Sequence, residues 1–131
     1  MQQIVFCVGC FWGAEKLFWR LPGVYSTAVG YAGGDAEATS PTYEVVCTGR
    51  TGHAEAVRVV FDPSVLATAD LMRCFWQCHD ATQIDGQGAD VGTQYRSAVF
   101  YANAEQRCIP LLLPFHYCPL CASTLPLLLP F

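Results

Sequence analysis

The sequence predicts an α+β fold, an α/β two-layer sandwich in which helices pack on one mixed β-sheet. Short apolar runs suited to strands alternate with helix-length segments up to residue 107. Glycines and prolines separate most of these segments, which marks their ends. The length of 131 residues is most simply a single domain, because domains commonly contain about 100–200 residues.

The first half of the chain contains three of the predicted elements. Residues 4–8 form an apolar run suited to a buried strand, and residues 11–21 form a helix that a Pro-Gly pair ends. Residues 24–29 predict a second strand. Three glycines within residues 30–34 then predict a loop.

The second half repeats the alternation of strand and helix. Residues 54–61 alternate apolar and polar side chains and end at an Asp-Pro pair, which predicts a strand. Ser64 or Thr68 can cap the helix that follows, whose apolar residues recur at i, i+4 and i+7. Residues 97–101 predict the last strand, and residues 104–107 begin a helix that the next segment interrupts.

The composition changes abruptly at Cys108. All 7 basic and 11 acidic residues lie between Glu15 and Arg107, whereas the last 24 residues carry five of the eight prolines and the sequence Pro-Leu-Leu-Leu-Pro-Phe twice. The prolines would break a membrane-spanning helix, because each removes a backbone donor. We therefore predict a folded domain over residues 1–107 and an irregular apolar tail over residues 108–131.

Charge and the N-terminal sequence exclude several functional classes. A net charge of −4 and a pI near 5.1 provide no basic surface for nucleic acid or for an anionic membrane. The first residues lack the basic and apolar regions of a signal peptide, so we expect a cytoplasmic protein. We also expect a monomer. In a reducing compartment, the eight cysteines are better candidates for catalysis, redox chemistry or metal binding than for structural disulfides.

Cys10 is the strongest candidate nucleophile. It lies between a predicted strand and a predicted helix, after Gly9, which permits a sharp turn. Unpaired N–H groups and the positive end of the helix dipole stabilise a thiolate at such a position. Cys47, Cys74 and Cys108 are interpreted as small apolar packing residues.

Four blocks of sequence, in order, resemble the A-type peptide methionine sulfoxide reductases. The first block contains Cys10, and the resemblance as a whole covers roughly residues 4–107. The blocks are Gly9–Glu15, Gly30–Gly34, Pro41–Glu55 and Asp90–Ser97. The resemblance implies a ferredoxin-like core and identifies residues 1–107 as the catalytic domain of such an enzyme, incomplete at its C-terminus.

The resemblance also implies a set of catalytic roles. Cys10 would attack the sulfur of methionine sulfoxide, and Glu55 would protonate the oxygen. The apolar neighbours of Glu55 suit a carboxyl that must hold its proton near neutral pH. Tyr43 and Tyr95 would hydrogen-bond the sulfoxide oxygen, and Asp90 would orient the substrate and support the site.

The same resemblance implies the substrate and the route of turnover. Phe11 and Trp12 would receive the methyl group of the S epimer of methionine sulfoxide, free or in proteins. Cys10 would become a sulfenic acid, which a second thiol converts to a disulfide that thioredoxin reduces. Cys118 and Cys121 are the possible resolving cysteines, and no metal or bound cofactor is implied.

Three alternatives remain open at this stage. Cys7 and Cys10 form a Cys-x-x-Cys pair that a thioredoxin-like oxidoreductase could use. A zinc module could use that pair with Cys118-x-x-Cys121 and with Cys78-His79, although the spacing between the pairs far exceeds the usual one of about 12–20 residues. The chain could also be an inactive product that interacts through its apolar tail.

Overall fold

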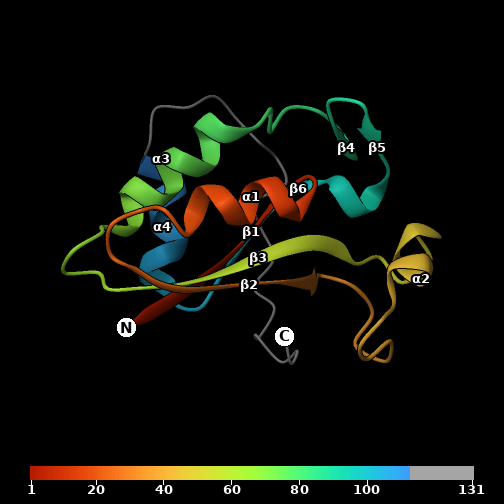
Figure 1. The fold of residues 1–131 in the computed structure, drawn as a ribbon, viewed down its shortest axis with the longest axis horizontal. Helices are drawn as coiled ribbons and strands as arrows, with labels where there is room; N and C mark the ends of the chain where they lie inside the picture. The colour runs from red at the N-terminus through yellow and green to blue at the C-terminus, as the bar shows by residue number, and fades with distance from the viewer. Residues whose placement is uncertain (113–131) are drawn as a thin grey trace.

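A four-stranded β-sheet forms the centre of the fold in the computed structural model, which describes residues 1–112 (Figure 1). The strands lie in the order β2-β3-β1-β6, and each neighbouring pair is antiparallel. Their bounds are β1 (Gln2–Val8), β2 (Val24–Ala32), β3 (Ala54–Phe61) and β6 (Ser97–Tyr101).

Two helices connect strands that are not neighbours in the sheet. α1 (Phe11–Phe18) links β1 to β2, and α3 (Thr68–Cys78) links β3 to β6. This is the split βαβ arrangement of a ferredoxin-like fold, so the predicted α+β class and its core are confirmed. The predicted mixed pairing is not found in residues 1–112, because each pair of parallel strands has an antiparallel strand inserted between its members.

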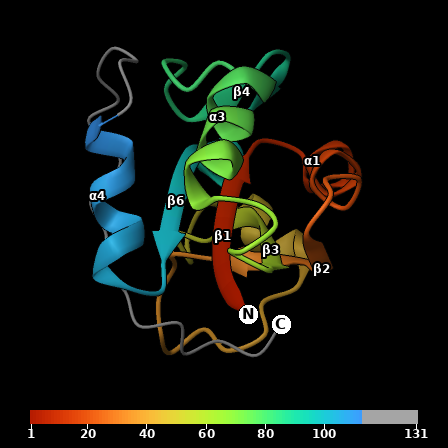
Figure 2. The same ribbon diagram turned by 90° about the vertical axis from the view of Figure 1, so that its left-hand side faces the viewer.

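Five further elements lie outside this arrangement. They are α2 (Tyr43–Cys47), β4 (Gly86–Gln87), β5 (Asp90–Val91), the 3₁₀ helix η1 (Thr93–Tyr95) and α4 (Ala104–Leu112). β4 and β5 pair as a short hairpin. α4 lies beside α3 and β6 (Figure 2), whereas α2 and the β4-β5-η1 segment lie together at one end of the sheet (Figure 1).

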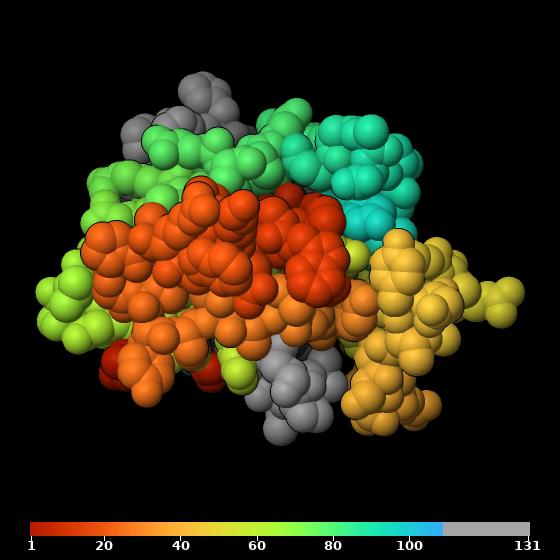
Figure 3. Space-filling model, viewed as in Figure 1, coloured from red at the N-terminus to blue at the C-terminus, as the bar shows by residue number. Residues whose placement is uncertain are grey.

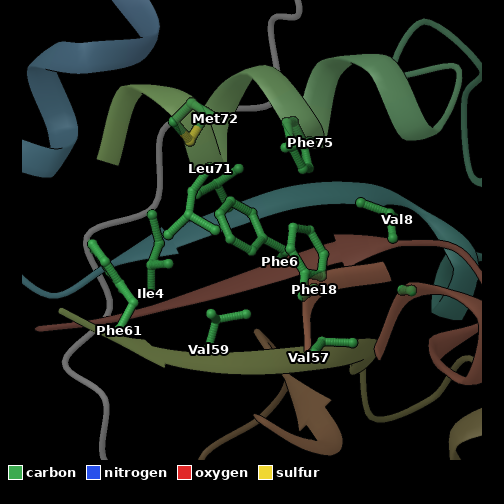
Figure 4. Packing of buried hydrophobic residues seen from close by; sticks show 12 residues of the cluster. Ile4, Phe6, Val8, Phe18, Val57, Val59, Phe61, Leu71, Met72 and Phe75 are labelled. Atoms are coloured by element: carbon green, nitrogen blue, oxygen red, sulfur yellow. The ribbon is translucent and has the colours of Figure 1, made fainter. Parts of the chain in front are cut away.

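The main core lies between the sheet and the helices α1 and α3. Alternate residues of β1 and β3 point to this face and meet apolar side chains of both helices (Figure 4). The ring of Phe6 stacks on Phe18 at 4.7 Å and on Phe75 at 5.5 Å, measured between ring centroids. Burial of one such side chain stabilises the fold by about 1.5–3 kcal/mol. A smaller apolar cluster on the opposite face includes Val5, Cys7 and Phe100.

The end of β2 and the start of α3 differ from the predictions. β2 extends to Ala32, three residues beyond the predicted end, because Gly30 and Ala32 pair with Ala56 and Ala54 of β3. Neither Ser64 nor Thr68 caps α3, because the helix begins at Thr68, its N-cap is Ala67, and no side chain makes a capping hydrogen bond there. Ser64 instead lies in a turn in which its backbone N–H and its hydroxyl donate hydrogen bonds to Asp62.

The helix α4 crosses the predicted boundary between domain and tail. It begins at Ala104 as expected but continues to Leu112, so the change of composition at Cys108 does not end the helix. Most of the predicted tail, residues 113–131, lies outside the described residues. Within residues 1–112, no helix is long and apolar enough to cross a bilayer.

Candidate active site

Cys10 lies at the N-cap of α1, between strand and helix as the sequence predicts, and its side chain is exposed. The chain turns from β1 into α1 through Gly9, whose φ is +96°. A Cβ atom at Gly9 would lie 2.7 Å from the Cβ of Gln87, so only glycine lets the 86–88 segment approach the turn before Cys10. The side chain of Gln87 is itself held by hydrogen bonds with the backbone N–H and C=O of Asp80.

Glu55 lies beneath the first turn of α1. It belongs to the same alternating set of β3 residues as Val57 and Val59, which face the helices. Its Oε2 accepts a hydrogen bond of 2.9 Å from the backbone N–H of Phe11, the residue after Cys10. A carboxyl group is therefore fixed beside the candidate nucleophile.

Burial raises the pKa of the Glu55 carboxyl above its ordinary value. Only 4% of this residue is exposed. Burial is the largest cause of the shift, the hydrogen bond from Phe11 opposes it, and the negative charge of Asp90 adds to it. Asp90, which is exposed on β5, therefore lies close enough to act electrostatically on Glu55. The structure thus favours the protonated form of Glu55.

Tyr43 and Tyr95 come from distant parts of the chain and lie next to each other. Tyr43 is the first residue of α2 and Tyr95 the last residue of η1. The pKa of Tyr43 is raised, first by hydrogen bonding to the Tyr95 phenol and then by hydrogen bonding to the Cys47 thiol. The two phenols predicted from the sequence are therefore adjacent, and Cys47 lies beside them. Cys47 is exposed, so its interpretation as a packing residue is wrong.

Tyr31 is a site residue to which the sequence assigned no role. It pairs directly with Glu55 across β2 and β3, so both side chains lie on the helix-facing side of the sheet. Its ring lies 5.8 Å from that of Phe11. Burial and the nearby Glu55 raise the pKa of Tyr31. Its position in the Gly30–Gly34 block was the sequence feature that pointed to it. That segment was predicted to be a loop, however, and in a loop the face to which a side chain points cannot be assigned from sequence.

Phe11 and Trp12 form an aromatic surface next to Cys10. Their rings meet edge to face at 5.2 Å. Phe11 is half-buried, whereas Trp12 is 69% exposed. Figure 3 shows that the surface is hollowed where the first turn of α1 (red), α2 (yellow) and the segment around β5 and η1 (cyan) approach one another. The arrangement offers an apolar wall at an open site.

Cys7 does not share this site. It is completely buried in the apolar cluster on the opposite face of the sheet. Burial raises the pKa of the Cys7 thiol to about 12. A dithiol couple needs two thiols that can reach the same disulfide, so this geometry disfavours the alternative in which Cys7 and Cys10 act together.

Of the other cysteines in residues 1–112, Cys74 and Cys78 belong to α3 and Cys108 belongs to α4. Cys74 is half-buried on α3, and Cys108 is exposed on α4, which corrects its interpretation as a packing residue. Cys118 and Cys121 lie outside the described residues. Within residues 1–112, no group of three or more His, Cys, Asp or Glu side chains is arranged to hold a metal ion.

An exposed cysteine at a helix N-terminus, beside a buried carboxyl and paired phenols, is typical of the class of proteins that react through a thiol. Comparison with known proteins defines the class further. The family model for peptide methionine sulfoxide reductase matches residues 2–111. The chain therefore belongs to the peptide methionine sulfoxide reductase family, and this prediction is confirmed.

Curated relatives support the same assignment. The chain is 58% identical over 106 residues to the peptide methionine sulfoxide reductases MsrA of Rhodospirillum centenum and Yersinia pestis. These matches cover 81% of this chain but 48% and 49% of the relatives. The chain thus spans about half the length of the curated relatives it matches.

Solved structures of the same family share the fold. Methionine sulfoxide reductase A of Corynebacterium diphtheriae matches with a TM-score of 0.76 and 48% identity, over 81% of this chain and 50% of that chain. Mxr1 from Saccharomyces cerevisiae in its reduced form matches with a TM-score of 0.77 and 34% identity, over 81% of this chain and 62% of that chain.

Proposed function

We propose that this chain reduces the S epimer of methionine sulfoxide to methionine, with Cys10 as the nucleophile and Glu55 as the general acid. The observation that carries the proposal is the 2.9 Å hydrogen bond from the Phe11 N–H to Glu55. It fixes a carboxyl, whose pKa burial raises, beside an exposed thiol at a helix N-terminus. Attack on sulfur and protonation of oxygen can then occur in one place.

The first chemical step needs no reactant other than the sulfoxide. The Cys10 thiolate attacks the sulfoxide sulfur while Glu55 gives its proton to the oxygen. The attack forms an S–S bond in an adduct whose substrate sulfur carries a hydroxyl group. The hydroxyl group then passes to the Cys10 sulfur as the S–S bond and the substrate S–O bond break, so methionine leaves as a thioether and Cys10 becomes a sulfenic acid. The substrate sulfur is reduced by two electrons and the Cys10 sulfur is oxidised by two.

The two phenols and the aromatic surface orient the substrate. Tyr43 and Tyr95 hydrogen-bond the sulfoxide oxygen and stabilise the negative charge that develops on it. Phe11 and Trp12 receive the methyl group, which fixes the orientation of the sulfur and hence the epimer. Asp90 supports the site through its charge near Glu55. The exposure of Cys10 and Trp12 supports methionine sulfoxide in proteins, as well as the free amino acid, as substrate.

Turnover requires an external dithiol. A second thiol condenses with the Cys10 sulfenic acid, releasing water and forming a disulfide, and thioredoxin reduces that disulfide. Cys118 or Cys121 could provide the second thiol. We expect the protein to act as a cytoplasmic monomer that repairs oxidised proteins without a bound cofactor.

A single-turnover assay tests the proposal. The reduced chain is mixed with a peptide that contains the S epimer, and methionine and Cys10 sulfenic acid are quantified by mass spectrometry with dimedone trapping. We expect about one equivalent of methionine without an added reductant, none with the R epimer, and none from Cys10→Ser. Absence of methionine with the folded wild-type chain contradicts the activity and favours an inactive product.

Cys7→Ser separates this mechanism from a dithiol couple. Because Cys7 lies on the opposite face of the sheet, the folded variant should retain its single-turnover yield. A thioredoxin-like exchanger would instead lose its activity in a disulfide-reduction assay. Loss of methionine formation in a folded Cys7→Ser variant would contradict the proposed roles.

A further inference from the structure

The guanidinium of Arg96 connects three segments of backbone. Its Nη1 donates a hydrogen bond of 2.9 Å to the carbonyl of Thr93. Its Nη2 donates to the carbonyl of Gly52 at 2.7 Å and to that of Gly33 at 3.4 Å. The planar guanidinium presents several donors in fixed directions, so one side chain can hold several acceptors at once.

Two of these carbonyls belong to the neck of a long excursion of the chain. The excursion is the segment of residues 33–53 that connects β2 to β3, and its neck is the place where the two ends of this segment meet. The chain leaves the sheet after β2 ends at Ala32 and returns where β3 begins at Ala54, and α2 with Tyr43 lies between (Figure 1). A backbone hydrogen bond of 2.8 Å from Asp35 to Thr51 also closes this neck. Tyr43 is thus carried by a segment whose two ends these bonds hold together beside the sheet.

The third carbonyl belongs to the turn that carries the other phenol. Thr93 begins η1, Tyr95 ends it, and Arg96 follows directly. The guanidinium therefore joins the η1 turn to the neck of the excursion. The two phenols belong to separate elements, and this connection between their segments is additional to the direct hydrogen bond between them.

The backbone around the guanidinium is shaped to admit it. Gly33 has a φ of +75°, and a Cβ there would lie 3.1 Å from Nη2 of Arg96 and 2.6 Å from the ring of Phe100. Gly52 has a φ of +68°. The neighbouring His53 is 1% exposed, and its pKa is lowered by burial and by the charge of Arg96. The lowered pKa favours the neutral imidazole, which does not repel the guanidinium.

We propose that Arg96 is a positioning residue, which holds the Tyr43 and Tyr95 phenols at the separation needed to bind the sulfoxide oxygen as its charge develops. This inference rests on the proposed function. Arg96 makes no contact with the reacting atoms and acts only through the two phenols. Lysine keeps the charge but cannot hold three carbonyls in one plane, so Arg96→Lys should loosen the pair without removing either phenol.

Single-turnover kinetics with the full chain measure this effect. The rate of methionine formation at increasing concentrations of the S-epimer peptide gives a maximal rate and a half-saturating concentration. A displacement of about 1 Å in a catalytic site can reduce the rate about 100-fold, so we expect the maximal rate of Arg96→Lys to fall by about 10- to 100-fold. The half-saturating concentration should change by less than about threefold, because phenols that act on the developing charge contribute little to substrate binding.

The matched control is Arg73→Gln. Arg73 is an exposed residue of α3 that forms an ion pair with Asp70 on the same helix. Its replacement removes one positive charge and leaves the phenols in place, so both kinetic parameters should stay within about twofold of wild type. Arg96→Gln should lose at least as much of the maximal rate as Arg96→Lys.

A second measurement does not depend on activity. With 3-fluorotyrosine incorporated, ¹⁹F NMR near pH 7 reports on each phenol, and Tyr43→Phe and Tyr95→Phe assign the two signals. We expect Arg96→Lys to move both signals, and Arg73→Gln to leave both unchanged. If the wild-type chain forms no methionine, the proposed function fails, and the NMR comparison alone decides whether Arg96 positions the phenols.

Three results overturn the inference. The first is a folded Arg96→Lys variant with the wild-type maximal rate. The second is unshifted signals from Tyr43 and Tyr95 in that variant. The third is loss of folding, by circular dichroism, in both Arg96→Lys and Arg96→Gln, which makes Arg96 a stabilising residue only.

Discussion

Glu55→Gln removes a proton donor from the candidate active site while keeping the shape of the side chain. The amide oxygen of glutamine can still accept the hydrogen bond from the Phe11 N–H, which is 2.9 Å long in this structure. The first turn of α1 and the exposed Cys10 should therefore keep their positions. Only the acidic proton is lost.

The expected size of the effect follows from that single change. A positioned general acid contributes about 10²–10⁴-fold to a rate, which corresponds to about 3–5 kcal/mol of transition-state stabilisation. We expect the single-turnover rate of Glu55→Gln to fall within that range at pH 7. Glu105→Gln, which removes a carboxylate exposed on α4, should retain the wild-type rate.

The pH dependence gives the assay its second criterion. Burial raises the pKa of Glu55, so its proton is retained above the ordinary range for glutamate. The wild-type rate should fall as the pH rises through this raised pKa, and Glu55→Gln should lack that descending limb. Rates measured in rapid-quench experiments between about pH 5 and 9 extend well above the ordinary pKa range of a glutamate.

Stability should depend on pH through the same group. Because the pKa of Glu55 is higher in the folded chain than in the unfolded chain, its contribution to stability is fully present below the unfolded pKa and is lost as the pH rises through the folded pKa. Urea unfolding should show this loss in wild type and not in Glu55→Gln. A variant with nearly the wild-type rate and an intact descending limb would refute the assignment of Glu55 as the acid.

Three further predictions address the phenols, the core and the neck of the excursion. Tyr43→Phe and Tyr95→Phe should each lower the single-turnover rate by about 10–10³-fold. The loss of rate in the double variant should be smaller than the product of the two single losses. An unchanged rate in both single variants would exclude the oxygen-binding role. Phe6→Ala should lower the free energy of unfolding by about 3–5 kcal/mol in urea titrations, because the ring stacks on both Phe18 and Phe75; a loss below about 1 kcal/mol would contradict this packing. Burial lowers the pKa of His53, so the free energy of unfolding should fall as the pH drops below about 6.5, and His53→Asn should weaken that dependence.

Local sequence patterns were sufficient to predict the main elements. The run over residues 4–8 is apolar at every position. In the structure these residues form most of β1, and all of them are buried. The helix after Cys10 was expected to end at a Pro-Gly pair, and α1 ends three residues earlier, at Phe18. These elements are specified by periodicity and by turn residues, which act over a few positions.

Elements that depend on distant partners were predicted less well. The glycines after Val29 predicted a loop, but β2 continues because β3 pairs with it as far as Ala32. α2 was missed because five residues are too few to show a helical period. The β4-β5 hairpin was missed as well, because strands of two residues show no alternation.

What the sequence by itself determined was the family, the α+β class and the candidate residues Cys10, Glu55, Tyr43 and Tyr95. These depend on residue identity and local order along the chain. Only the tertiary structure decided that Glu55 bonds the N–H after Cys10, that Cys7 lies on the opposite face of the sheet, and that Arg96 joins the segments of both phenols. The physical reason is that each of these relations joins side chains and backbone groups from separate elements, and the direction of a side chain is set by sheet register and packing rather than by its neighbours in sequence.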